Sequence, residues 1–172
     1  MRIFGRKDTE PDPLAGVDLG LEAGDRVLAA CVDTATGEVL AASRHHLSIA
    51  APDGEVRLQR PWHLVDTGSY DNDADVLHVS WVDRAPDLAL RVGGHRLFLQ
   101  AFRERVQASV VVAENLDLGS GRAARLVIRK DLAQDRLLDQ VLLGKGVRLG
   151  DPGVRRRVEL TRHALREQVG LP

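Results

Sequence analysis

The hydrophobic pattern of this chain changes its period near residue 95. In the residues before that point, short runs alternate apolar and polar side chains between turn signals, as in "DVLHVSWVD", where Leu77, Val79 and Trp81 share one face. A period of two is typical of half-buried strands. In "HRLFLQAFRERVQASVVV", apolar residues recur three and four apart, which predicts an amphipathic helix over about residues 95–107. The sequence therefore predicts an α+β fold, in which an antiparallel barrel or sandwich is capped by this helix.

The residues after this helix predict a hairpin and two more helices. "SVVVAENLDL" and "RAARLVIRK" flank a Gly-Ser-Gly turn, which predicts a C-terminal β-hairpin. "DLAQDRLLDQVLLGKG" has Asp131 as a candidate N-cap, apolar residues at helical spacing and Gly144 as a stop, which predicts a helix. Asp151 followed by Pro152 predicts the start of a last helix over 152–169.

The length of 172 residues suits one domain with extensions. We expect a flexible N-terminal arm over 1–23, a β-meander with its capping helix over 24–112, and a hairpin and two-helix extension over 113–172 that packs on the same domain. The basic N-terminus lacks the apolar stretch of a secretory signal, and no run approaches the roughly 20 apolar residues of a transmembrane helix. Cys31 is the single cysteine, so no internal disulfide can form. These features favour a cytoplasmic protein.

Charge is distributed unevenly along the chain. Residues 1–94 carry 9 basic and 16 acidic side chains, whereas residues 95–172 carry 15 basic and 9 acidic ones. A basic half could bind an anion or nucleic acid, or the two halves could neutralise each other within one fold. The candidate anion-binding residues are Arg125, Arg129, Arg155, Arg162 and Arg166. No aromatic residue is interleaved with these arginines, so nucleic-acid binding is not favoured.

The stretch "SYDNDADV" places Asp71, Asp73 and Asp75 at alternate positions, which is the spacing of the first ligands in an EF-hand calcium loop. The glycine that such a loop needs at position 6 and the glutamate at position 12 are replaced by Val76 and Val82. We therefore interpret the aspartates as a turn that feeds a strand, and we expect no metal site.

Other signatures of chemistry are weak. The histidines of the strand-rich half could contribute to a zinc site, but no pair has metal-ligand spacing, and adjacent His45 and His46 would point to opposite faces of an extended chain. "GSGRAA" imitates a dinucleotide fingerprint but is followed by a β-rich run rather than a helix. The chain has no G-x-S-x-G motif, no P-loop and no H-E-x-x-H motif, and no Cys–His arrangement can be argued from the sequence. We therefore expect no cofactor and no enzymatic activity.

Several stretches of the first half resemble the bacterial pleckstrin-homology-like (PH-like) domains, over about residues 24–112. They are "GDRVLAACVD", "GEVLAASRHHLSI", "LQRPWHLVDTGSYDNDADVLHVSW" and, for the terminal helix, "HRLFLQAFRERVQASV". The resemblance implies a non-catalytic platform for proteins or peptides. In family members that bind phosphoinositides, the loop after the first strand is basic. Here that loop is "DTATGE", without lysine or arginine, which argues against a phospholipid headgroup site.

The sequence thus leads to two hypotheses about function. The first is a cytoplasmic, non-catalytic interaction module of PH-like type, which binds a protein partner or a second copy of itself through an exposed strand edge or a groove beside the terminal helix. The alternative is anion or nucleic-acid binding through the arginine-rich C-terminal half. The alternative requires Arg125, Arg129, Arg155 and Arg162 to converge on one surface.

Overall fold

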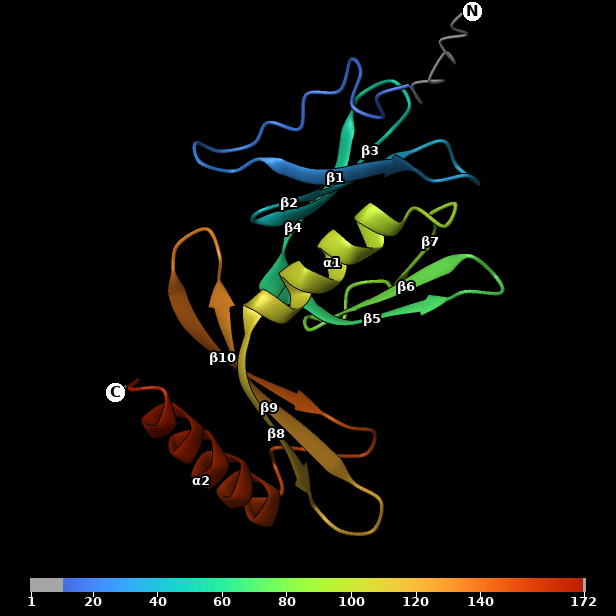
Figure 1. Cartoon of the computed structure of the whole chain (residues 1–172). Coiled ribbons are helices and arrows are strands. Elements are labelled where there is room, and N and C mark those ends of the chain that lie inside the picture. Colours follow the sequence, from blue (N-terminus) through green and yellow to red (C-terminus); the bar gives the residue numbers. More distant parts are fainter. Residues whose placement is uncertain (1–10, 172) are drawn as a thin grey trace, which may run out of the picture.

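The computed structural model describes residues 11–171 and shows an α+β fold with three antiparallel sheets (Figure 1). The first sheet contains β1 (Val27–Val32), β2 (Val39–Ser43), β3 (His46–Ala50) and β4 (Val56–Pro61), and the second contains β5 (Val65–Asp71), β6 (Val76–Trp81) and β7 (Leu88–Arg91). Helix α1 (Arg96–Ser109) follows the second sheet. The third sheet consists of β8 (Val110–Asp117), β9 (Ala123–Asp131) and β10 (Arg136–Leu143), and helix α2 (Pro152–Gln168) comes last. Among residues 11–171, no helix is long and apolar enough to cross a membrane.

The main core lies where the first two sheets meet α1. A short 3-10 turn, Trp62–Leu64, joins β4 to β5 and places the fully buried Trp62 between the sheets and the helix. The Trp62 ring meets the Phe102 ring edge to face at 5.6 Å, and its Nε1 donates to the backbone carbonyl of Ser43. Phe98 is also fully buried, so the aromatic stripe of α1 faces the core as its periodicity predicts. The two sheets remain separate, so of the predicted barrel or sandwich, the closed barrel is not formed.

The residues just before β1 cover the outer face of the first sheet. Leu19 is buried against Val39, Ala41 and Ala50, and the side chain of Gln59 donates to the carbonyl of Leu19. Residues 1–10 of the predicted flexible arm lie outside the described residues, whereas its remainder contacts the sheet.

A second core forms between α2 and one face of the third sheet (Figure 1). β8 and β9 pair around the Gly-Ser-Gly turn, as the sequence predicts. Helix α2 begins after Asp151, whose side chain accepts hydrogen bonds from the amides of Gly153 and Val154. Val154, Val158 and Leu165 form its buried stripe.

The predicted helix over residues 131–144 is wrong, because residues 136–143 form strand β10, paired in antiparallel register with β9. Asp131 does accept hydrogen bonds from the amides of Ala133 and Gln134, as an N-cap would. The following turn instead reverses the chain, with Asp135 in the left-handed region at a φ of 54°. The extension therefore contains one helix and a three-stranded sheet rather than a hairpin and two helices.

Candidate functional site

The aspartate run forms a structural turn. Asp71 accepts hydrogen bonds from the amides of Asp73 and Ala74, which closes the turn between β5 and β6. Asp75 accepts hydrogen bonds from the Tyr70 hydroxyl at 2.7 Å and from the amides of Gly93 and Gly94 at 2.8 Å. The hydrogen bond from Tyr70, with those of the two amides, lowers the pKa of Asp75.

The histidines are not grouped as metal ligands either. His45 and His46 both face Asp25, with ring nitrogens 3.9 Å and 3.2 Å from its carboxylate. The expectation that they point apart assumed an extended chain, and that condition is not met, because His45 lies in the turn between β2 and β3 and His46 is the first residue of β3. No group of three or more potential ligands occurs in the described part of the chain.

The five candidate arginines fall into separate places and bond to the protein itself. Arg125 on β9 pairs with Asp66 at 3.3 Å. Arg162 and Arg166 on α2 both bond to Asp139 of β10, at 2.9 Å and 2.7 Å.

The other two candidates are engaged with backbone or hydroxyl groups. Arg155 donates from its Nε to the carbonyl of Leu149. Arg129 is fully buried, and it donates to the Ser109 hydroxyl at 3.0 Å and to the carbonyl of Asp66. Burial and the nearby Arg125 lower the pKa of Arg129. The anion or nucleic-acid alternative requires four of these arginines to converge on one surface. That condition is not met, because Arg129 is fully buried and both Arg125 and Arg162 are paired with carboxylates.

Buried Arg129 belongs to the joint between the third sheet and the rest of the molecule. Gln140 of β10 also belongs to this joint, and its side-chain amide donates to the carbonyl of His63 at 2.9 Å. Burial lowers the pKa of His63, which favours a neutral imidazole there. Together these contacts hold the third sheet against α1, β5 and the turn between β4 and β5.

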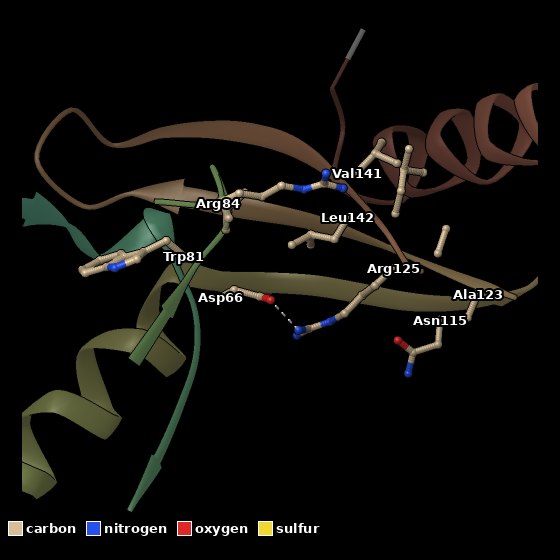
Figure 2. A pocket seen from close by; sticks show the side chains of 12 residues that line it. Asp66, Trp81, Arg84, Asn115, Ala123, Arg125, Val141 and Leu142 are labelled. Atoms are coloured by element: carbon tan, nitrogen blue, oxygen red, sulfur yellow. Dashed lines mark hydrogen bonds and ion pairs between the residues drawn. The ribbon is translucent and has the colours of Figure 1, made fainter. Parts of the chain in front are cut away.

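A cleft of about 480 Å³ opens where the end of the second sheet faces the third sheet (Figure 2). Trp81, Val82 and Arg84 line one wall. The other wall includes Asn115 of β8, Arg125 of β9 and Leu142 of β10. They lie side by side because Asn115 and Leu142 each pair across the sheet with Arg125. The Asp66–Arg125 ion pair spans the space between the two walls (Figure 2).

A second hollow, of about 400 Å³, runs between α1 and strand β5 and is called here the α1/β5 groove. Its lining residues are Gly68, Tyr70, Leu77, Leu99, Phe102, Arg103, Val106 and Gln107. β5 lies at the edge of its sheet, and residues 67–69 are exposed. The groove therefore places an apolar floor directly beside a strand edge.

Comparison with protein-family models, curated proteins and solved structures gave no match to this chain. Function is therefore inferred from the two hollows and the side chains that line them.

The residues of these hollows were missed at the level of sequence. Gly68 lies inside a polar strand, "VDTGSYD", where a glycine is usually interpreted as a residue that weakens the strand or marks a bulge. Arg84 stands in a turn after a strand, and nothing in "WVDRAP" distinguishes it from a solvated side chain. The one available signal was the amphipathic stripe of α1, which identified Phe102 and Val106 as residues facing the sheet.

Proposed function

We propose that this chain is a non-catalytic interaction module of PH-like type, cytoplasmic, which binds an extended segment of a partner protein in the α1/β5 groove. An antiparallel meander followed by a helix that covers the junction of its sheets supports the PH-like assignment. The single observation that carries the binding proposal is the exposed edge of β5 beside an apolar groove.

The strand edge supplies the main-chain part of such a site. In an antiparallel pair, every second residue of an edge strand directs its N–H and C=O groups away from its partner strand. Within residues 11–171, β5 pairs with β6 alone, so backbone groups of its other edge are available to an added strand, apart from the carbonyl of Asp66, which accepts from Arg129. Strand addition of this kind provides affinity through backbone hydrogen bonds and specificity through pockets for alternate side chains.

The groove supplies the side-chain part. Leu99, Phe102 and Val106 offer an apolar surface for one buried side chain of the partner. Arg103 is exposed at the rim, and the described residues provide no ion-pair partner for it. We therefore propose a partner segment with an apolar anchor and a neighbouring carboxylate that pairs with Arg103.

A displayed library of random ten-residue peptides tests this proposal. Peptides selected on the wild-type protein are expected to share an apolar anchor flanked by an acidic residue. They should lose binding to Val106→Ser, which removes part of the groove floor. They should retain binding to Leu97→Ser, the matched control, because Leu97 is 68% exposed on the same helix but does not line the groove.

Two results would contradict the proposal. One is a selection in which the enriched peptides bind Val106→Ser as tightly as wild type, provided that thermal unfolding shows both variants to be folded. The other is a concentration-dependent dimer in light scattering that Val106→Ser abolishes, since a second copy of the chain would then occupy the groove instead of a partner segment.

A further inference from the structure

Arg84 has a backbone conformation that is unusual for its residue type. Its φ is 60°, in the left-handed region. The other non-glycine residues described with positive φ are Asp75, Ser120 and Asp135, which have short polar side chains. Asp and Asn are tolerated there because they bond locally to the backbone, whereas a long side chain has no such compensation. A strained residue of this kind often serves a binding site.

The Arg84 side chain lines the cleft between the second and third sheets. The side chain extends across the cleft toward β10 (Figure 2). The neighbouring carboxylate of Asp83 is occupied by Arg60, which also lies over the Trp81 ring at 4.3 Å. Within residues 11–171, the Arg84 guanidinium has no ion-pair or hydrogen-bond partner.

The charge balance of the cleft is positive. Asp66 is the one carboxylate in its lining, and Arg125 pairs with it at 3.3 Å. Arg129, buried behind the same wall, bonds to the carbonyl of Asp66 and not to a carboxylate. The charge of Arg84 is therefore uncompensated at a concave surface, where the field of a charge is focused.

The remaining lining is suited to an organic molecule. Leu142, Val82 and Trp81 give the cleft apolar walls, and Asn115 faces it with an amide that can donate or accept. A few polar groups that converge on an apolar hollow of several hundred Å³ are characteristic of small-molecule sites.

We propose that the cleft binds a small organic anion with an apolar body. The anionic group bonds to Arg84, and the apolar body lies against Leu142 and Val82. The site is independent of the α1/β5 groove, because no residue lines both hollows.

Two fluorescent probes of matched shape test this proposal. 8-Anilinonaphthalene-1-sulfonate is an organic anion with an aromatic body, and N-phenyl-1-naphthylamine is its neutral counterpart. Arg84→Gln is expected to weaken sulfonate binding about tenfold, as the loss of one charge-assisted hydrogen bond does. Binding of the neutral probe should be unchanged. Arg156→Gln, at an exposed position on α2 outside the cleft, removes the same charge and should leave both affinities unchanged.

The location of the probe gives a second readout. In amide chemical-shift mapping, the sulfonate probe should shift the side-chain amide of Asn115 and the backbone amides of Ala123 and Leu142. Equal sulfonate affinities for Arg84→Gln and Arg156→Gln would overturn the proposal, as would shifts confined to the α1/β5 groove or no sulfonate binding by wild type. Val106→Ser separates the two proposals, because it should abolish peptide binding and leave the probe affinities intact.

Discussion

Gly68 of β5 lies directly against the Phe102 ring of α1. A Cβ atom at position 68 would stand 2.2 Å from Cε1 and 2.7 Å from Cζ of that ring. The absence of a side chain at this one position lets the helix approach the edge strand, and the groove between them is built on that contact.

Gly68→Ala should therefore destabilise the protein. The phenylalanine ring is 4% exposed and packed on Trp62, so it cannot move away freely. Overpacking of this kind costs about 1–3 kcal/mol of unfolding free energy, which urea unfolding would measure. Gly150→Ala is the matched control, because nothing lies within 4 Å of its added Cβ. Equal stability of the two variants would show that the helix does not rest on β5.

Phe102→Ala should be among the most destabilising single substitutions. It removes a buried ring from the main core and leaves a cavity beside Trp62, at a cost of about 3–5 kcal/mol. Leu97→Ala, on the same helix but 68% exposed, should change stability by less than about 0.5 kcal/mol. A similar loss for both variants in chemical unfolding would contradict the placement of the apolar stripe.

Asp139→Asn should loosen α2 from the third sheet. Hydrogen bonds from Arg162, together with that of Arg166, outweigh burial and lower the pKa of Asp139. Because both arginines are partly exposed, we expect a loss of about 1–2 kcal/mol at pH 7.

The ion pairs of Asp139 with Arg162 and Arg166 also predict that stability depends on pH. A carboxylate whose pKa is lowered by folding stabilises the protein fully above its unfolded pKa, and this contribution is lost as the pH falls through the folded value. The difference in unfolding free energy between wild type and Asp139→Asn should therefore shrink as the pH is lowered below the ordinary aspartate pKa of 3.8. Asp73→Asn, an exposed control, should cost little at any pH. A difference for Asp139→Asn that stays constant down to pH 2 would contradict the ion pair.

Arg84→Gly should stabilise the protein while it removes the anion site. A left-handed backbone conformation destabilises a residue with a long side chain by about 1–2 kcal/mol. Glycine removes this strain but makes the unfolded chain more flexible, so we expect a net gain in unfolding free energy of about 0.5–1 kcal/mol. Ser120→Gly, at a φ of 56°, should gain less because serine is small and polar. A loss of stability for Arg84→Gly would mean that the arginine is held there by contacts within the fold.

The sequence predicted those features that depend on local pattern. The period-two alternation of Leu77, Val79 and Trp81 and the helical stripe of Phe98 and Phe102 both identify faces that the structure buries. The Gly-Ser-Gly hairpin and the capped start of α2 also depend on neighbouring residues alone.

The errors arise where distant residues decide the structure. The run from Leu137 to Leu143 has apolar residues on both faces, with Asp139 on one and Gln140 on the other, so its period cannot distinguish helix from strand. Pairing with β9 decides between them. The two hollows could not be predicted either. Gly68 meets Phe102, and Arg84 lies in one cleft with residues of β10, only because elements far apart in the chain are packed together.

The most direct test of the α1/β5 groove as a binding site is amide hydrogen exchange with and without a selected peptide. Added as a strand, the peptide should protect amides within residues 67–70 and leave the edge strand β8 unchanged, and this protection should be lost in Val106→Ser. Protection that falls on β8 or α2, with residues 67–70 exchanging as fast as in the free protein, would contradict the proposed function.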